Sequence, residues 1–367
     1  MDKLKNMKIK KQVILTPAPA NTTKTVKQAQ CLPDICPREK EFGELLESIN
    51  LDLLKVVYAN PKDYTSVLLT GSGTSAMDSI INSTLNYNDK LLILINGAYG
   101  ERFRQIAETY NIKYEIYKVK WGKFLDLKKI EQILINDIDI THIAVIHHET
   151  TTGILNPIIE IGQLAKKYNR TYIIDTISSI GGVPIDIQKI NADYILGSAN
   201  KCLQGIPGIS FIIAKRKTLN KIKNYPKRSY YLDLWRNYSY FKKKKQTPFT
   251  PAVQCIYALR QALNEYFKEG EQERYKRYFL NWLFLKPSMC QLGFKPYYKK
   301  NCESHLVTTF YQPENFNFKL FHDKLKEKGF TIYPGKLTKE KTFRIGNIGN
   351  ITIKDIENFL KVVKEIL

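Results

Sequence analysis

The stretch YTSVLLTGSGTSAMDSIINSTL, residues Tyr64–Leu85, contains one complete pattern of strand, loop and helix. It begins with an apolar run of strand length and continues through a loop of small residues, Gly71–Thr74. After the loop, side chains recur at the i, i+3, i+4, i+7 and i+8 positions of a helix face: Met77, Ile80, Ile81, Thr84 and Leu85. A strand that is covered on both faces has a continuous apolar sequence. The stretch therefore predicts one strand and helix unit of an α/β fold.

The same alternation continues after this unit. Five more apolar runs of strand length follow, with helical segments between them, at residues 90–96, 142–148, 171–176, 193–198 and 210–216. Strands that alternate with helices in this way predict a mostly parallel central sheet with helices on both faces.

The character of the chain changes near residue 260. Long basic and aromatic helices follow, and after them come shorter strands at residues 305–311 and 342–348. We therefore expect three parts: an N-terminal arm (residues 1–20) that packs with a small domain, a large domain (residues 21–260), and the small C-terminal α+β domain (residues 261–367).

Composition and charge narrow the classes of function. The net charge of +22 raises a nucleic-acid-binding scaffold as one alternative. The lysines are spread along the whole chain, however, and the densest run, residues 241–246, has no recognition motif beside it. We expect no nucleic-acid partner. Because the sequence contains no apolar run of about 18 residues, we also expect no membrane association and a cytoplasmic location.

The metal-binding residue types are not arranged as a metal site. The six cysteines lack the paired spacing of zinc ligands, so we expect free thiols. His147 and His148 are adjacent, and neighbouring side chains of a strand point to opposite faces. We expect no metal.

The loop Gly71–Thr74 has the form of an anion cradle. Glycines let the backbone approach a ligand closely, and the start of the following helix presents unpaired N–H groups. Two alternatives stay open for this segment. It also fits a dinucleotide fingerprint with Asp89 as the acidic partner, and it could be a simple tight turn.

Two further residues lie where the ligands of open α/β sheets bind. Asp175 and Lys201 each come at the carboxyl end of a predicted strand. Alone, the acid could be a turn residue and the lysine a solvated surface residue. Together with the cradle they form the set that pyridoxal phosphate needs: a phosphate site, a carboxylate for the ring nitrogen, and a lysine for a Schiff base with the aldehyde.

The sequence also resembles a known family over nearly its whole length. It is similar to the class V branch of the fold-type-I pyridoxal-phosphate-dependent aminotransferases, and within it to enzymes that act on phosphonates. Seven blocks carry the resemblance, in order: PDICPREKEFGELL (33–46), VLLTGSGTSAMDSI (67–80), INGAYGERF (95–103), HETTTGILNPI (148–158), IIDTISSIGG (173–182), SANKCLQGIPG (198–208) and YPGKLTKEKTFRIGNIG (333–349).

The resemblance implies roles for residues around the cofactor. It places Tyr99 on the pyridine ring, Thr151 near the 3-hydroxyl, and Asp175 at the ring nitrogen. Asn200 accompanies Lys201, which would form the Schiff base. The phosphate would be held by three residues of the cradle, Ser72, Gly73 and Thr74.

Two other positions concern the partner subunit and the substrate. The resemblance implies that Thr250 reaches the phosphate of the neighbouring subunit, which makes the enzyme a homodimer with shared active sites. It implies that Arg344 clamps the substrate's carboxylate or phosphonate, and the fork of an arginine suits either anion.

The activity implied by the resemblance is transfer of the amino group from 2-aminoethylphosphonate to pyruvate, or the reverse. The alternative is an alanine:glyoxylate or serine:pyruvate aminotransferase, because the cofactor residues are shared and only the substrate pocket differs. The sequence departs from the family at Ala18, where a glycine is usual. It departs again at Thr247 and Pro248, where many members have Trp-Arg. A nearby lysine could replace that arginine as a point charge.

Overall fold

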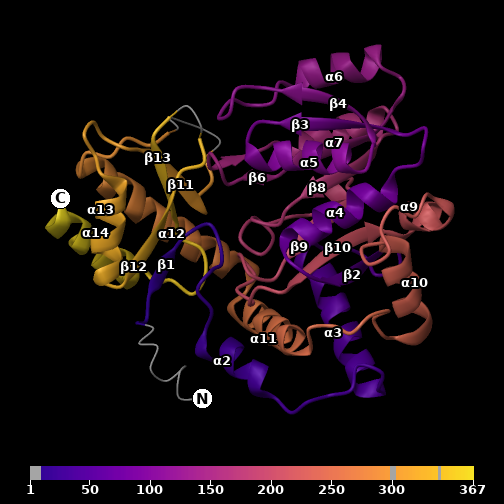
Figure 1. Ribbon diagram of the computed structural model, residues 1–367, viewed down its shortest axis with the longest axis horizontal. Coiled ribbons are helices and arrows are strands. Elements are labelled where there is room, and N and C mark those ends of the chain that lie inside the picture. Colours follow the sequence, from indigo (N-terminus) through magenta and orange to yellow (C-terminus); the bar gives the residue numbers. More distant parts are fainter. Residues whose placement is uncertain (1–9, 298–302, 338–339) are drawn as a thin grey trace.

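The structure is a computed structural model that describes residues 10–297, 303–337 and 340–367. These residues form a larger lobe and a smaller lobe, which lie on the right and the left of Figure 1. Residues 1–9 of the expected arm, Cys302 among the expected thiols, and residues 338–339 of the last resemblance block lie outside the described residues.

The larger lobe is built on a seven-stranded sheet. Its strand order is β2-β10-β9-β8-β5-β3-β4. Only β10 runs antiparallel to its neighbours, and the other pairs are parallel, which confirms the expected mostly parallel sheet. The strands are β2 (Tyr64–Thr70), β3 (Lys90–Ile95), β4 (Lys113–Lys118), β5 (Ile140–Ile146), β8 (Thr171–Asp175), β9 (Tyr194–Ser198) and β10 (Ile209–Lys215).

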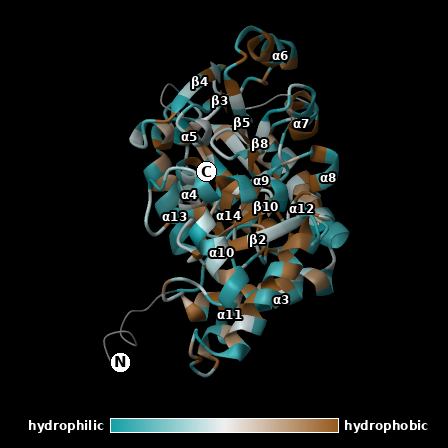
Figure 2. Ribbon diagram, turned by 90° about the vertical axis from the view of Figure 1, so that its right-hand side faces the viewer, coloured by the Kyte–Doolittle hydropathy of each residue, from teal (hydrophilic) through white to brown (hydrophobic). Residues whose placement is uncertain are grey.

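Helices cover both faces of this sheet because successive strand residues point to opposite sides. In β3, Leu92 and Leu94 belong to one apolar core, and Leu91 and Ile93 belong to the other. The first core is closed by helices α3 (Lys40–Val56), α6 (Leu127–Asn136), α7 (Ile158–Lys167), α8 (Ile187–Ile190) and α11 (Val253–Glu269). The second is closed by α4 (Gly73–Thr84), α5 (Ala98–Thr109), α9 (Arg216–Lys221) and α10 (Leu234–Lys244). Figure 2 shows helices that mix hydrophobic and hydrophilic residues, as expected for covering layers.

The smaller lobe combines both ends of the described chain. Its sheet has the order β1-β12-β13-β11, and β1 runs parallel to β12. The strands are β1 (Val13–Leu15), β11 (Val307–Tyr311), β12 (Phe330–Pro334) and β13 (Thr342–Gly346), and the helices are α12 (Glu271–Gln291), α13 (Phe318–Glu327) and α14 (Ile353–Ile366). Phenylalanines dominate its core, among them Phe310 and Phe343.

The join between the lobes lies in a pair of helices. Helix α11 buries Ile256, Leu259 and Leu263 in the core of the large sheet, whereas α12 contributes Leu285 to the small core. Gly270, with φ 86°, separates the two helices. Residue 260, the expected end of the large domain, lies inside α11.

Short elements complete the described chain. They are α2 (Lys24–Gln28), the 3-10 helices Ala29–Cys31 and Ile222–Asn224, and a two-stranded sheet of β6 (His148–Glu149) and β7 (Ile154–Leu155). Within the described ranges, no helix combines the length and the apolar character that a membrane crossing requires. The same ranges contain no group of three or more His, Cys, Asp or Glu side chains that could hold a metal ion.

Candidate active site

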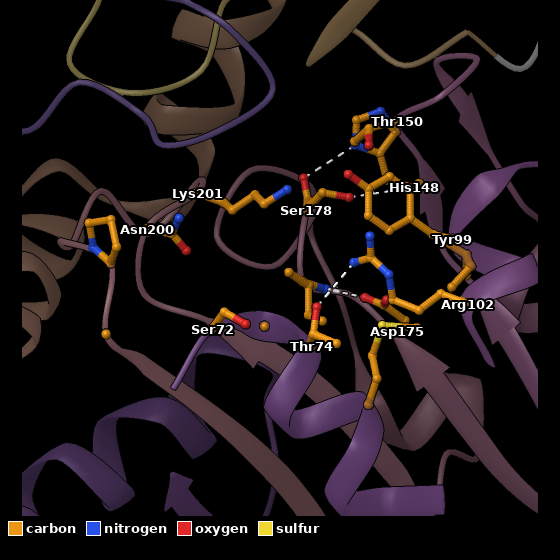
Figure 3. A pocket seen from close by; sticks show the side chains of 16 residues that line it. Ser72, Thr74, Tyr99, Arg102, His148, Thr150, Asp175, Ser178, Asn200 and Lys201 are labelled. Carbon is orange, nitrogen blue, oxygen red and sulfur yellow. Dashed lines mark hydrogen bonds between the residues drawn. The ribbon is translucent and has the colours of Figure 1, made fainter. Parts of the chain in front are cut away.

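The parallel strands of the large sheet end at one edge, and a cavity lies there. The segments that follow β2, β3, β8 and β9 bring seven of the ten predicted site residues to its lining: Ser72, Gly73, Thr74, Tyr99, Asp175, Asn200 and Lys201. Figure 3 shows Lys201 and Tyr99 on opposite sides of this cavity, with Thr74 and Asp175 below them in the view. The edge is the place where open α/β sheets bind their ligands.

The loop after β2 is suited to an anion. Ser72 is the N-cap residue of α4, but its hydroxyl makes no capping hydrogen bond. The N–H groups of Gly73 and Thr74 have no acceptor among the described residues. The Thr74 hydroxyl accepts a hydrogen bond of 3.1 Å from Nη1 of Arg102. A helix start with free N–H groups and a guanidinium beside it favours a phosphate.

Asp175 is the last residue of β8 and is only 4% exposed. Its Oδ1 accepts a 2.8 Å hydrogen bond from the Ile177 N–H. Burial raises the pKa of Asp175 to about 7, although that hydrogen bond and the charges of Lys201 and Arg102 oppose the rise. A cation placed against this buried carboxyl would therefore strongly stabilise its ionised form.

Lys201 lies in the loop after β9, and its surroundings fix the backbone there. The Ala20 N–H donates to the Asn200 carbonyl at 3.0 Å, and the Gln204 N–H donates to the Lys201 carbonyl at 2.9 Å. The side chain is 8% exposed, and Nζ has no hydrogen-bond or salt-bridge partner in the described part of the chain. A buried amine with a free Nζ is a suitable nucleophile.

Tyr99 is held by a buried carboxylate at the start of α5. Oε2 of Glu149 accepts from the N–H groups of Tyr99, at 3.1 Å, and Gly100, at 3.4 Å. Glu149 is fully buried, and burial raises its pKa. At Gly97 there is no room for a side chain, because a Cβ atom would lie 2.2 Å from Cδ of Glu149.

The structure differs from the expectation at Thr151. The Thr151 hydroxyl donates to Oε1 of Glu149 at 2.6 Å, and this residue does not line the cavity. Thr150 lines it instead, and its buried hydroxyl makes no well-formed hydrogen bond to a described residue. The two residues share a tight turn between β6 and β7, where the direction of each side chain depends on the turn geometry. Of the two residues, Thr150 is therefore the one that faces the cavity.

The two remaining predicted residues lie outside the lining of the cavity. Arg344, on β13, is 3% exposed and donates to the Pro334 carbonyl at 3.2 Å and the Thr150 carbonyl at 3.4 Å. It therefore borders the cavity from the small domain. Thr250 is exposed and does not line the cavity of its own chain.

The sequence reasoning missed several residues of the lining, among them Arg102, His148 and Ser178. Arg102 lies three residues after Tyr99, so helical spacing could have placed both on one face of α5. His148 is 1% exposed, and its Nε2 has no partner in the described part of the chain. Its Nδ1 lies 3.2 Å from the Ser178 carbonyl, an interaction that the sequence does not reveal.

This donor set fits pyridoxal phosphate. The free N–H groups at Gly73 and Thr74 match its phosphate, and the hydroxyl of Thr150, in the lining of the cavity, matches its 3-oxygen. Asp175 and Lys201 line the same cavity, where the first would offer a carboxylate to the ring nitrogen and the second a free amine to the aldehyde. A dinucleotide would not require the lysine. The structure therefore favours a phosphate cradle over a dinucleotide fingerprint for the loop Gly71–Thr74.

Comparison with other sequences agrees with this donor set. The class-V aminotransferase family ("Aminotransferase class-V") matches residues 34–333. The 2-aminoethylphosphonate–pyruvate transaminase of Lysinibacillus sphaericus is 41% identical over 96% of this chain and 96% of its own. The 2-aminoethylphosphonate–pyruvate transaminase of Bacteroides fragilis is 39% identical over 97% of this chain and 99% of its own.

Solved structures share the fold at lower identity. An alanine–glyoxylate aminotransferase from Nostoc superposes with a TM-score of 0.92 and 23% identity, over 98% of this chain and 96% of that one. A pyridoxamine-pyruvate aminotransferase from Mesorhizobium loti superposes with a TM-score of 0.91 and 22% identity, over 98% of this chain and 93% of that one. The fold, the residues at the strand ends and the related sequences agree: the chain belongs to the class-V aminotransferase family.

Proposed function

We propose that this enzyme transfers the amino group of 2-aminoethylphosphonate to pyruvate, giving phosphonoacetaldehyde and alanine, and that it also runs in reverse. The reaction class is carried by one observation: a buried lysine, a buried aspartate and a helix start with free N–H groups line one cavity. The choice of substrate is supported by the relatives at 41% and 39% identity, whose names specify this pair.

Different residues would bind different parts of pyridoxal phosphate. Ser72, Gly73 and Thr74 would bind the phosphate, and Lys201 would hold the aldehyde carbon through Nζ. Tyr99 would lie against the ring, and Thr150 would bond the 3-oxygen. When bound, pyridoxal phosphate supplies an electron-withdrawing ring that stabilises negative charge on the carbon next to the amine.

Asp175 and Lys201 would handle the protons. Asp175, whose burial raises its pKa, becomes the counter-ion of a protonated ring nitrogen, and its negative charge keeps that proton in place. When Nζ of Lys201 is not holding the aldehyde, it would be free to take the proton from the substrate carbon that bears the amine. Arg344 would hold the substrate's anion, because its fork can donate two parallel hydrogen bonds.

A homodimer completes this proposal. Thr250 is exposed, and beside it the rings of Tyr231 and Phe249 stack with centroids 5.1 Å apart. Tyr230, 70% exposed, lies against the same phenylalanine at 5.6 Å. An exposed aromatic cluster is typical of an interface. A partner subunit packed here would bring Thr250 toward the second active site.

The amino-donor profile tests the proposal. The purified protein, incubated with 2-aminoethylphosphonate and pyruvate, should form alanine, and Lys201→Ala should abolish both this activity and the yellow colour of the bound cofactor. Serine and alanine, offered with glyoxylate, serve as competing substrates. Robust turnover of these with none of the phosphonate would replace the proposal by the alanine:glyoxylate or serine:pyruvate alternative.

A further inference from the structure

Positive charge is concentrated around the ring of Tyr99. Measured to the ring centroid, Cζ of Arg102 lies at 4.8 Å, Nζ of Lys336 at 5.0 Å and Nζ of Lys201 at 5.9 Å. Figure 3 shows Lys201 and Arg102 pointing toward this ring. Burial raises the pKa of the Tyr99 phenol, but Lys201, Lys336 and Arg344 lower it, and the net shift is downward. The Tyr99 side of the cavity is therefore strongly electropositive.

Besides Lys336, the cations around Tyr99 are Arg102, Lys201 and Arg344, and each of these three has another role. Arg102 donates to the Thr74 hydroxyl in the phosphate cradle, at 3.1 Å. Lys201 would hold the cofactor. Arg344 is buried and fixed by the carbonyls of Pro334 and Thr150. Each of these side chains has a set position before any substrate arrives.

Lys336 differs from the other three. It is exposed and lies just after β12, the strand that pairs directly with the Arg344 strand, β13. Within the described ranges no carboxylate lies within salt-bridge distance of its Nζ, which lies over the Tyr99 ring. A lysine that covers an aromatic ring and has no acidic partner can turn toward an incoming anion at small cost.

We infer that Lys336 is the residue that favours a phosphonate over a carboxylate at the substrate's anionic end. A carboxylate carries one negative charge, which Arg344 alone can balance. A phosphonate resembles a phosphate monoester, which carries about 1.5 to 2 negative charges near neutral pH and has three acceptor oxygens. Lys336 supplies the second positive charge and a donor for the third oxygen. The inference rests on the proposed function, and it assigns the substrate preference to one side chain.

The same arrangement explains how one site can serve both substrates. Pyruvate needs only Arg344, so Lys336 stays over the Tyr99 ring. With the phosphonate, Lys336 leaves the ring and pairs with the anion. Because the lysine is exposed, water and salt weaken this pairing, and it tunes affinity without being required for the chemistry.

The test separates the two substrates with a pair of variants. Lys336→Met keeps the length of the side chain and removes its charge, and Lys336→Arg keeps the charge. We expect Lys336→Met to raise KM for 2-aminoethylphosphonate about five- to tenfold, and to leave kcat and KM for pyruvate within about twofold. Lys336→Arg should stay close to the wild type. Lys324→Met is the matched control, since it removes one exposed lysine from α13 in the same domain.

A binding measurement that needs no turnover accompanies the kinetics. Calorimetry with ethylphosphonate and with propionate compares the two anions without an amine. The wild type should prefer ethylphosphonate, and Lys336→Met should lose most of that preference. Equal effects of Lys336→Met on both anions, or the same effect from Lys324→Met, would overturn the inference. Failure of the wild type to convert 2-aminoethylphosphonate would instead overturn the proposed function, and the anion preference would remain measurable.

Discussion

At the scale of single residues, the active site is built from side chains of distant parts of the chain that meet at one edge of the large sheet. Asp175 and Lys201 could be predicted because strand ends in an open α/β sheet converge on one edge. The choice between Thr150 and Thr151 could not, because it depends on the direction of two side chains in a tight turn. Glu149 was also missed, since its role depends on the N–H groups of α5, about fifty residues earlier in the chain.

The charge of Asp175 gives the first prediction at this scale. Asp175→Asn keeps the shape of the side chain but cannot balance a protonated ring nitrogen. We expect kcat for alanine formation to fall by roughly two orders of magnitude or more, while KM changes little. Steady-state kinetics of the loaded enzyme measure this. If Asp175→Asn kept more than a tenth of the wild-type kcat, the counter-ion role would be refuted.

The close approach at Gly97 gives a second prediction. In Gly97→Ala the new methyl group would overlap the Glu149 carboxyl, whose hydrogen bonds position Tyr99. We expect a loss of about 1–3 kcal/mol in the free energy of unfolding, as is usual for overpacking. Urea denaturation measures it. Glu149→Ala makes room for the methyl group, so the cost of Gly97→Ala should shrink in that background. Additive costs would show that the two residues do not clash.

At the scale of helices and strands, the apolar runs predicted most of the large sheet, because buried strands have a continuous apolar sequence. The edge strand β4, KYEIYK, was missed, since none of its residues is buried and they form no apolar run. The small domain was predicted only in outline. Its first strand, β1, has three residues, and its pairing with β12 cannot be recognised locally.

The junction of α11 and α12 gives a prediction at this scale. Arg274, near the start of α12, is 1% exposed and pairs with Glu269 at 2.7 Å. Its Nη1 also donates to the Cys202 carbonyl, next to Lys201, at 3.1 Å. Arg274→Met would remove both of these bonds from a buried place, and Glu269 and the Cys202 carbonyl would keep only their bonds to Arg277 and Tyr278. We expect about 3 kcal/mol less stability in urea denaturation and faster loss of the bound cofactor in dialysis.

A variant of Glu269 sharpens this test. Glu269 also pairs with Arg277 at 2.7 Å, so Glu269→Gln weakens the junction while Arg274 keeps its bond to the lysine loop. It should cost stability but hold the cofactor nearly as well as the wild type does. Equal cofactor loss in both variants would contradict a specific link from α12 to that loop.

At the scale of the whole molecule, buried titratable groups set the response to pH. Burial lowers the pKa values of four histidines from 6.5, to about 4 for His142, His147 and His305 and to about 3 for His148. Above pH 6.5 these histidines are neutral in both the native and the unfolded protein. As the pH falls from 6.5 to about 4, the unfolded chain takes up protons that the native chain cannot, so each histidine lowers stability.

Two buried acids act in the opposite direction. Burial raises the pKa of Asp175 from 3.8 to about 7 and also raises that of Glu149. Between pH 7 and 3.8 the native Asp175 binds a proton that the unfolded chain does not, so its contribution to stability grows as the pH falls. Four histidines outweigh two acids, and the net effect of these groups is a loss of stability in acid.

The expected outcome is therefore a fall in the free energy of unfolding of the cofactor-free protein between pH 6.5 and 5. The slope should reach roughly 2–3 kcal/mol per pH unit, since one titrating group contributes about 1.4 kcal/mol. Urea denaturation at several pH values measures it. His142 is distant in the sequence from Asp175 and Lys201. His142→Gln should reduce the slope by about 1.4 kcal/mol per pH unit, the contribution of one group. A flat profile in this range would contradict the assignment of neutral buried histidines.

The pairing of β1 with β12 also bears on how the protein is made. Val13 lies opposite Phe330, so more than three hundred residues separate two neighbouring strands of the small sheet. The large domain is thus an insertion within the small one. During synthesis the large domain can fold on the ribosome as soon as α11 has emerged, whereas β1 must wait for β12. Because the Ala20 N–H bonds the Asn200 carbonyl beside Lys201, the active-site lysine gains its final support only after β12 has been synthesised.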